Sequence, residues 1–316
     1  MFDTIASITR GERGEDDSPA GSDGADAEAT AVVTDTEGSA STLTGEDLVV
    51  GYPGTDQPVI DGAAITAKQG AMTALVGPNG SGKSTLLKGL ANQLAPDEGS
   101  VLIDGEDIHT LDTKALARKL GLLSQESTAP DSITVEDLVY HGRYPHRGFF
   151  EHVTDEDVRA VDNAIELAGC DHLRDRAVGQ LSGGQKQLAW IAMVLAQETD
   201  VLLLDEPTTF LDLHHQLAVM EIVETLRDER DITVVVVLHD IEQAARHADR
   251  IIALKDGEIR ARGRPTDVVT EDLLAEVFGI EADVEPTDRG PTITPIGPIH
   301  EDRDADAPDT SADGSR

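Results

Sequence analysis

Short apolar runs alternate with longer stretches of helical periodicity through the middle of the chain. The apolar runs have the length of buried strands, and they lie at residues 72–76, 120–123, 201–204, 234–238 and 251–254. The stretches of helical spacing lie at residues 85–94, 184–197, 213–230 and 241–247. Strands that alternate with helices favour a mostly parallel sheet with helices on its faces. The pattern therefore predicts an α/β fold.

Two regions depart from this alternation. Near the start, short apolar runs predict several strands in close succession, at residues 48–50, 59–60, 63–67 and 100–104. From residue 126 to residue 180 the helical patterns, at 135–141 and 155–168, come without a convincing strand. This second region is predicted to be a helical insert within the α/β domain.

The two ends of the chain are rich in acidic and small polar residues and poor in apolar ones. Residues 1–43 and 283–316 cannot bury enough apolar surface to offset the entropy of ordering, so we predict that both are disordered tails. A closing helix is expected at Thr270–Phe278. No internal repeat is visible, and one domain is therefore predicted at residues 46–280.

One glycine-rich stretch carries specific chemistry. Gly77–Ser84 matches G-x-x-x-x-G-K-[ST] and stands between a predicted strand and a predicted helix. Its glycines let successive N–H groups face one anion, at the positive end of the following helix. Lys83 supplies a charge to the β- and γ-phosphates, and Ser84 offers a hydroxyl to Mg²⁺. The predicted phosphate-binding residues are Gly77, Pro78, Asn79, Gly80, Ser81, Gly82, Lys83, Ser84 and Thr85.

Charge narrows the function classes. The formal net charge is -36, and the acid is not confined to the tails. An acidic surface argues against nucleic-acid binding, which needs a basic face. Only seven of the 25 basic residues are lysines, and acidity with scarce lysine suggests adaptation to high salt, as in a halophilic archaeon. An acidic protein from an ordinary cytoplasm remains the alternative.

Cysteine and apolar content bound the compartment. Cys170 is the only cysteine, so no intrachain disulfide and no cysteine-based metal site is expected. No run approaches 18 apolar residues, and the first residues lack the features of a signal peptide. We therefore expect a soluble, intracellular chain, and if it acts at a membrane, another chain must span it.

Polar residues stand at the ends of three of the predicted strands. Asp205 and Glu206 end the run at 201–204, at the sheet edge where such folds place ligands. Asp205 there can reach Mg²⁺, and Glu206 can serve as a general base. His239 follows the run at 234–238, and Gln125 follows the run at 120–123. An ordinary strand end, a structural histidine and a loop glutamine are the bland alternatives.

Two further stretches complete the set. Leu181-Ser182-Gly183-Gly184-Gln185 opens a predicted helix, where Ser182 can cap the helix and the glycines expose N–H groups to an anion. Tyr52 stands just before Pro53 and Gly54, and its ring could stack on a base, although it could equally be a tyrosine of a surface turn.

From about residue 47 to residue 279, these motifs resemble the ATP-hydrolysing subunit of ABC transporters. The resemblance implies a P-loop NTPase core with a mostly parallel sheet, an N-terminal antiparallel β subdomain and an inserted helical subdomain. It also implies that two copies form a head-to-tail homodimer, in which Ser182, Gly183, Gly184 and Gln185 of one copy close on the γ-phosphate held by the other. Asp212, in the loop at 209–212, would lie near the dimer axis, although it could also be a helix N-cap.

The same resemblance assigns roles at the nucleotide. ATP and Mg²⁺ are the implied cofactors, with Tyr52 on the adenine. Ser84, Asp205 and Gln125 are the implied metal ligands. Glu206, His239, Lys83 and Gln125 are the implied catalytic residues, with Glu206 as the base and His239 on the γ-phosphate.

Weaker markers resemble the importer subgroup that handles iron–siderophore chelates, haem and cobalamin. These markers are the segments at 140–146, 188–193 and 211–216. They imply a separate membrane permease that docks on the helical insert, an extracytoplasmic substrate-binding protein, and a location at the cytoplasmic face of the membrane. Within the insert, Arg143, Tyr144 and Phe149–Phe150 are expected to offer the docking surface.

The histidines do not add a metal site to this interpretation. His141, His146, His152 and the pair His214–His215 lack the spacing of a metal-binding helix, so surface or interface roles are favoured.

Other functions remain open. An ABC transporter of different cargo, or an exporter, would carry the same catalytic motifs. A soluble ABC ATPase of DNA repair would carry long coiled-coil insertions, and no sustained heptads appear. A P-loop kinase or GTPase would not explain Leu181–Gln185. The sequence does not choose among the possible cargoes.

Overall fold

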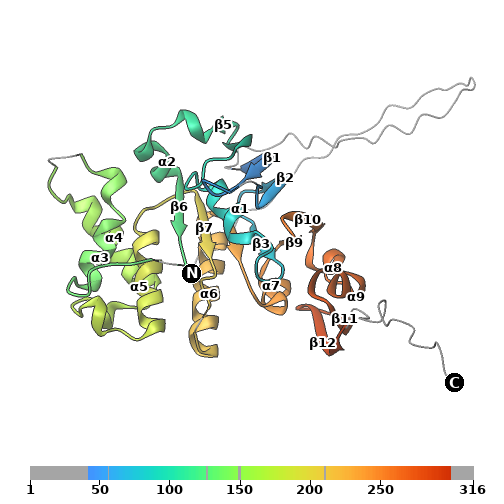
Figure 1. Ribbon diagram of the computed structural model, residues 1–316. Coiled ribbons are helices and arrows are strands. Elements are labelled where there is room, and N and C mark those ends of the chain that lie inside the picture. Colours follow the sequence, from blue (N-terminus) through green and yellow to red (C-terminus); the bar gives the residue numbers. More distant parts are fainter. Residues whose placement is uncertain (1–41, 56, 126, 149–150, 210, 300–316) are drawn as a thin grey trace, which may run out of the picture. The chain divides into compact units, whose positions relative to one another are not determined.

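A six-stranded sheet forms the centre of the fold. The computed structural model describes residues 42–299, except 56, 126, 149–150 and 210. The sheet has the order β10-β9-β3-β8-β7-β6, in which β3 pairs in parallel with β8 and β9, and β7 with β6 and β8, while β10 is antiparallel (Figure 1). The strands are β3 (Met72–Val76), β6 (Leu120–Leu123), β7 (Val201–Asp205), β8 (Thr233–Val237), β9 (Arg250–Lys255) and β10 (Glu258–Gly263). The predicted mostly parallel sheet is confirmed.

The burial of the central strands accounts for the unbroken apolar runs in the sequence. Every residue of β3, β7 and β8 is buried, because both faces of a parallel sheet are covered. The two faces belong to different cores. In β3, Met72, Ala74 and Val76 join one hydrophobic cluster and Leu75 joins the other, as the period of two requires.

A second, antiparallel sheet precedes and flanks the centre. Its order is β2-β1-β4-β5, with β1 (Leu43–Val50), β2 (Ile60–Ala67), β4 (Glu98–Ile103) and β5 (Glu106–Asp107). The runs predicted at 59–60 and 63–67 merge into the single strand β2. Strand β1 begins earlier than expected, because Leu43 is fully buried and pairs with Ala67 and Ile103.

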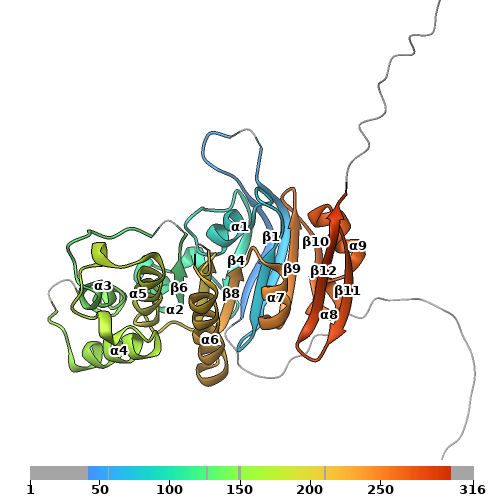
Figure 2. The ribbon, with the colours of Figure 1, turned by 90° about the horizontal axis from the view of Figure 1, so that it is seen from below.

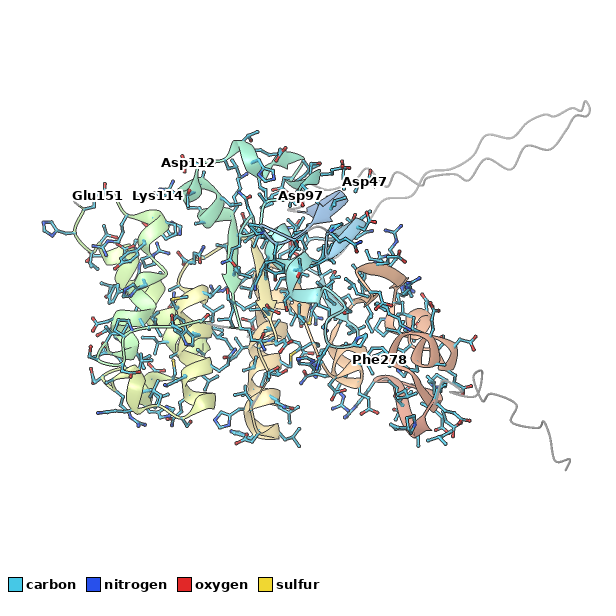
Figure 3. All side chains as sticks on the ribbon, viewed as in Figure 1. Asp47, Asp97, Asp112, Lys114, Glu151 and Phe278 are labelled. Atoms are coloured by element: carbon cyan, nitrogen blue, oxygen red, sulfur yellow. The ribbon has the colours of Figure 1, made fainter. Side chains whose placement is uncertain are left out.

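Helices flank the central sheet and link its strands. They are α1 (Lys83–Leu90), α2 (Thr113–Lys119), α6 (Leu213–Arg230) and α7 (Ile241–His247), with a short 3-10 turn at Ile108–Thr110. Helix α1 packs into the cluster with the antiparallel sheet, and α6 and α7 pack into the other cluster. Acidic side chains gather on the outside, as Figure 3 shows for Asp47, Asp97 and Asp112, all of which are exposed.

The helical insert lies beside the edge strand β6 (Figure 2). It contains α3 (Val135–His141) and α4 (Asp155–Leu167), which pack on α5 (Gly183–Leu195). Short 3-10 turns join them at Tyr144–His146, Asp171–Leu173 and Val178–Gln180. Among the described residues between 127 and 180 no strand forms, and only an isolated bridge joins Thr134 to Ala177. The predicted helical character of the insert is confirmed.

Arg143 holds this insert together from the inside. Only 1% of its side chain is exposed, and Nε lies 3.0 Å from an oxygen of Asp157, at the start of α4. Its Nη1 donates to the Ala196 carbonyl, at 2.8 Å, and to Glu198, at 2.7 Å. The expectation that Arg143 contributes to a docking surface is therefore wrong. Its neighbour Tyr144 is 56% exposed, and Phe149–Phe150 lie outside the described residues.

The C-terminal part continues further than predicted. After α8 (Pro265–Val268) and α9 (Glu271–Leu273), a π-helical turn at Leu274–Phe278 leads into a hairpin of β11 (Ile280–Thr287) and β12 (Gly290–Pro298). The closing helix expected at Thr270–Phe278 therefore forms, with Thr270 as the N-cap of α9 and Leu274–Phe278 continuing it in π-helical form.

Disorder from residue 283 was the wrong expectation for residues 283–298. Ala282 and Ile293 of the hairpin are buried, and the Ile293 N–H donates to Glu242 of α7 at 3.3 Å. Three buried residues, Ala282, Pro291 and Ile293, and an anchored backbone order a hairpin whose other residues are half-buried or exposed. The expected tails at 1–41 and 300–316 lie outside the described residues. Within the part that the structure describes, no helix is long and apolar enough to cross a membrane.

We predict that Arg143→Ala destabilises the protein by about 3 kcal/mol, because it leaves the carboxylate of Asp157 buried without its charged partner. Burial acts to raise the pKa of Asp157, but hydrogen bonds from Thr154 and Arg143 outweigh it and lower that pKa. Denaturant unfolding at neutral pH measures the loss. Arg159→Ala, on the exposed face of α4, is the matched control and should change stability by less than about 0.5 kcal/mol. Equal stabilities of the two variants would contradict the role of Arg143.

Candidate functional site

The predicted phosphate loop links β3 to α1, and close packing dictates its glycines. Gly77 has φ of 148°, and a Cβ there would collide with the Leu254 carbonyl oxygen. Gly82, the N-cap of α1, has φ of 98°, and a Cβ there would lie 2.6 Å from a methyl of Ile60. Only glycine fits both positions. The loop is therefore fixed by its neighbours as well as by its own sequence.

Two polar groups inside the loop are poised for an anion. The Ser81 hydroxyl is buried and has no hydrogen-bond partner among the described residues. The Lys83 ammonium donates to the carbonyls of Gly77, at 2.9 Å, and Pro78, at 3.0 Å. Burial lowers the pKa of Lys83, and the charges of Glu206 and Asp205 partly oppose that shift. A buried ammonium and an unpaired hydroxyl fit the phosphates of a nucleotide.

The predicted metal ligands are brought together only in part. The Ser84 hydroxyl donates to Asp205 at 2.9 Å, so these two oxygen groups meet. Burial raises the pKa of Asp205, although the bond from Ser84 opposes the shift. A desolvated carboxylate beside a hydroxyl suits Mg²⁺, which uses few protein ligands together with phosphates. Gln125 does not join this pair, and its amide instead donates to Glu206.

Fewer than three metal-ligating side chains gather at any point of the described residues, counting histidine, cysteine, aspartate and glutamate. No separate histidine-based metal site therefore forms there.

Glu206 is the most constrained residue of the site. It directly follows β7 with φ of 52°, a left-handed conformation that non-glycine residues seldom adopt. One carboxylate oxygen lies 2.6 Å from His239 Nε2. The other accepts from Gln125, at 2.9 Å, and from Thr209, at 3.2 Å. The side chain is 7% exposed, so its carboxylate is held by three neighbours in a nearly dry position.

A cavity of about 180 Å³ brings the loop and Glu206 together. Its lining comprises Val59, Asn79, Gly80, Gly82, Lys83, Ser84, Thr85 and Glu206. Tyr52 stands at the rim of this region. Its side chain is 42% exposed, and its hydroxyl lies 3.4 Å from that of Thr85. An exposed ring beside the phosphate loop is compatible with stacking on a base, which stays a prediction.

The segment Ser182–Gln185 forms a capped, exposed helix start. The Ser182 hydroxyl accepts from the Gln185 N–H at 3.3 Å, and the Gln185 side chain accepts from the Ser182 N–H at 3.2 Å. Ser182 and Gly183 are exposed, and the segment does not contribute to the lining of the phosphate-loop cavity as the structure describes it. A complete capping box leaves the glycine backbone free to meet a group from outside the chain.

Sequence reasoning missed a contact that supports this segment. The ring of His215 packs on Gly184, where a Cβ would come within 2.8 Å of it. Asp212 caps α6 and accepts from the His215 N–H at 3.0 Å, and its carboxylate lies 2.8 Å from His215 Nδ1. Gln216 donates to the carbonyls of Thr208 and Leu211. His215 is visible in the sequence, but its contact with Gly184 becomes apparent only in the folded structure.

Two relatives of known name match most of the chain. The ferric enterobactin transport ATP-binding protein of Escherichia coli (strain K12) is 44% identical over 261 residues, which cover 82% of this chain and 96% of that protein. The cobalamin import ATP-binding protein of Halobacterium salinarum is 37% identical over 255 residues, which cover 80% of this chain and 63% of that protein.

Solved structures agree with these relatives. An inward-facing transporter described as of the metal-chelate type matches with a TM-score of 0.69 and 26% identity, over 82% of this chain and 98% of that one. A dimeric ATP-binding cassette in a post-hydrolysis state with ADP and Pi matches with a TM-score of 0.63 and 29% identity, over 70% and 98%.

A family model supplies the last comparison. The model for the ABC transporter family matches residues 60–209, which include the phosphate loop, the segment Ser182–Gln185 and Glu206. Together with the extent and identity of the relatives, this match shows that the chain belongs to the ABC transporter family, as one of its ATP-binding, ATP-hydrolysing subunits.

Proposed function

We propose that this chain drives an importer that takes up an iron(III)–siderophore chelate through a separate membrane permease. The observation that carries the proposal is the 44% identity to a ferric enterobactin transport protein over nearly its whole length. Cobalamin is the second candidate cargo, because the relative from Halobacterium salinarum is named as a cobalamin import protein. Haem, a different cargo and export remain the alternatives that the sequence left open.

The residues of the site have the arrangement that ATP hydrolysis needs. The Lys83 ammonium and backbone N–H groups of the loop Gly77–Gly82, except at Pro78, which has none, bind the phosphates, and Tyr52 stacks on the adenine. Ser84 and Asp205 would hold Mg²⁺, which would supply positive charge to neutralise the phosphates. Gln125, whose amide nitrogen donates to Glu206, would offer its amide oxygen to the same ion.

Glu206 acts as the general base. Its carboxylate accepts a proton from a water molecule, the water oxygen attacks the γ-phosphorus, and the bond to the bridging oxygen breaks with ADP leaving. The surrounding contacts keep the carboxylate in place, with His239 and Gln125 on separate oxygens. His239 also reaches the γ-phosphate. The Lys83 charge stabilises the negative charge that develops on the transferred group.

A second copy completes the site. Ser182 and Gly183 are exposed, and the segment Ser182–Gln185 does not contribute to the described lining of its own chain's phosphate cavity, so it is available to the γ-phosphate held by another copy. Asp212 and His215 support this segment from the start of α6. The two copies therefore close as a head-to-tail homodimer on two ATP molecules.

The helical insert passes this closure to the permease. Exposed apolar side chains on the insert, Tyr144 at 56% and Val153 at 46%, offer a docking surface. The chain is thus a peripheral protein at the cytoplasmic face, and an extracytoplasmic binding protein delivers the cargo to the permease. Arg143 supports the surface from inside the insert.

We predict that Glu206→Gln binds ATP but hydrolyses it about 10²- to 10⁴-fold more slowly, because the amide cannot accept the proton. ATP hydrolysis and ATP-dependent dimerisation measure the two effects, and the variant should accumulate as an ATP-bound dimer. Glu229→Gln, at an exposed position late in α6, is the control and should hydrolyse ATP at the wild-type rate. Normal hydrolysis by Glu206→Gln would rule out this residue as the base.

We predict that His215→Ala raises the ATP concentration needed for dimerisation by about five- to tenfold, because Ser182–Gln185 loses its support. Dimerisation is followed by size-exclusion chromatography in the Glu206→Gln background, where hydrolysis does not interfere. His214→Ala removes the adjacent ring but leaves the bond between His215 and Asp212, and should dimerise normally. An equal effect of both substitutions would show that the contact with Gly184 does not matter.

The cargo is tested in a strain that lacks this chain. Uptake of a radiolabelled ferric siderophore should fall to background and return with the wild-type gene, but not with Glu206→Gln. Cobalamin-dependent growth, measured in the same strain, should be unaffected. Normal iron uptake together with lost growth on cobalamin would overturn the siderophore assignment in favour of the second candidate.

A further inference from the structure

A second cavity, distant in sequence from the phosphate loop, lies where the C-terminal hairpin meets α7 and α8. Its volume is about 560 Å³. We define the arginine cleft by its lining, which comprises Ala245, Arg246, Ala248, Asp249, Arg264, Pro265, Thr266, Asp288, Arg289 and Gly290. Three separate elements each contribute one arginine to it. The proposed hydrolysis of ATP makes no use of these residues.

Like Arg159 and several other arginines of the described residues, the three arginines of the cleft have no carboxylate partner, but here three of them line one cavity. The chain has 61 acidic residues against 25 basic ones, so acidic partners are abundant. Arg143, Arg174 and Arg227 each pair with carboxylates at 3.0 Å or less. Among the described residues, by contrast, Arg246, Arg264 and Arg289 make no ion pair. Three like charges around one cavity repel one another, and an anion between them would turn that repulsion into attraction.

The two carboxylates of the cleft do not cancel this charge. Asp249 is already engaged, because it accepts from the Met72 N–H at 2.8 Å and lies 3.4 Å from Arg227. Asp288 is the other, at the hairpin turn. The three arginines of the lining therefore outnumber its one uncommitted carboxylate.

The cleft is built on a fixed backbone. Gly290 has φ of 101°, and a Cβ there would collide with the Ala245 carbonyl, so the hairpin turn presses directly on α7. The Thr287 hydroxyl donates to the Gly290 carbonyl at 2.6 Å and accepts from the Arg289 N–H at 3.3 Å. The backbone that carries Arg289 is thereby held in place. Such a preformed frame lowers the entropic cost of binding a ligand.

We propose that the arginine cleft binds a small soluble anion that carries two or more phosphate groups. Guanidinium groups pair with phosphate oxygens through two parallel hydrogen bonds, which makes arginine the favoured residue for such recognition. A cavity of this volume holds a metabolite and not a macromolecule. The Thr266 hydroxyl and the Asp288 carboxylate can meet hydroxyl groups of the same ligand.

The position of the cleft means that a bound ligand can affect the nucleotide site through α7. Helix α7 begins directly after His239 and Asp240, and the cleft lies at its other end. The hairpin also bonds to Glu242, in the first turn of α7. A ligand that ties the hairpin to α7 therefore restrains the helix that carries His239 at its start. This consequence rests on the proposed function, whereas the binding itself does not.

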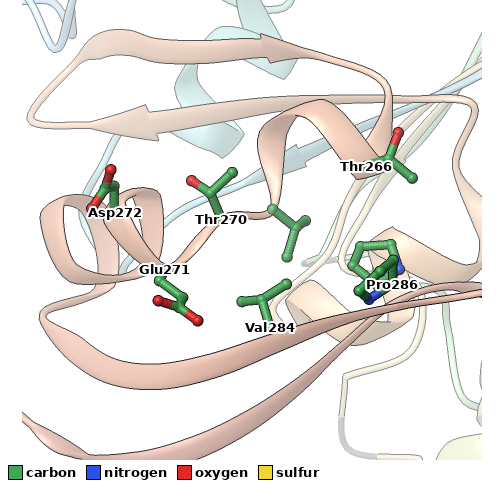
Figure 4. A pocket seen from close by; sticks show the side chains of 8 residues that line it. Thr266, Thr270, Glu271, Asp272, Val284 and Pro286 are labelled. Atoms are coloured by element: carbon green, nitrogen blue, oxygen red, sulfur yellow. The ribbon is translucent and has the colours of Figure 1, made fainter.

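A neighbouring cavity provides an internal comparison. It shares Thr266 with the arginine cleft but carries Glu271 and Asp272, with Val284 and Pro286 on the hairpin side (Figure 4). Its carboxylates repel anions. A phosphate-bearing ligand should therefore distinguish two cavities that the same hairpin builds.

Binding is measured by titration calorimetry with pyrophosphate, using the full chain with Lys83→Ala to weaken the phosphate loop, at one fixed ionic strength. The double variant Arg246→Gln with Arg289→Gln should raise the dissociation constant at least tenfold. Arg159→Gln, an exposed arginine on α4 without an ion pair in the described structure, is the matched control and should leave binding unchanged. Thermal unfolding checks that each variant is folded.

Two results would overturn the proposal. One is an unchanged dissociation constant in the double variant, and the other is an equal loss with Arg159→Gln, which would mean that general surface charge binds pyrophosphate. Glu271→Gln provides a further check, because it removes a negative charge from the neighbouring cavity. If pyrophosphate bound there, this substitution would strengthen its binding markedly, whereas binding in the arginine cleft should change little. Since the Lys83→Ala background removes turnover from the readout, the anion proposal can fail while the Glu206→Gln prediction holds, and the reverse.

Discussion

The position of the Glu206 carboxylate depends on one constraint, the common edge at which parallel strands end. Strands β3, β6, β7 and β8 run in the same direction, and the phosphate loop, Gln125, Glu206 and His239 follow them in turn. Gln125 and His239 are far apart in the chain, yet both lie within hydrogen-bond distance of this one carboxylate. Glu206 itself adopts a left-handed backbone conformation, which costs energy that the surrounding contacts must offset.

This constraint also explains how much of the fold and of the site could be predicted. Fully buried strands produce unbroken apolar runs, so β3, β7 and β8 and the polar residues after them could be identified from the amino-acid sequence alone. The hydrogen-bond partners of these polar residues within the site could not be predicted from the sequence. Ser84, Asp205 and Gln125 were expected to hold one Mg²⁺ together; in the structure the Ser84 hydroxyl donates to Asp205, whereas the Gln125 amide donates to Glu206. A glutamine in a loop reaches several strand ends, and spacing along the chain does not choose among them.

Two other features were wrongly predicted because their cause is tertiary. Arg143 looks like a surface residue, yet it is buried by Asp157 and Glu198, which lie 14 and 55 positions later. The hairpin at 280–298 looks like an acidic tail, since only alternate positions are apolar and few of them are buried. Its order comes from Ile293 and Gly290, which contact α7. Composition indicates how much surface a segment can bury by itself, whereas Arg143 and the hairpin are ordered by contacts with distant parts of the chain.

The C-terminal hairpin and the nucleotide site both contact α7. The start of this helix adjoins His239 and Glu206, and its end adjoins the arginine cleft. At its start, Asp240 caps the helix directly after His239, and Gln243 accepts from Thr208 in the loop after Glu206. At its end, Arg246 lines one cavity with two further arginines in a protein of net charge -36. Helix α7 has about two turns, so only a short hydrogen-bonded segment separates the two regions. The hairpin and the Glu206 carboxylate are thus joined through one chain of contacts, which runs from the hairpin to α7 and from there to His239.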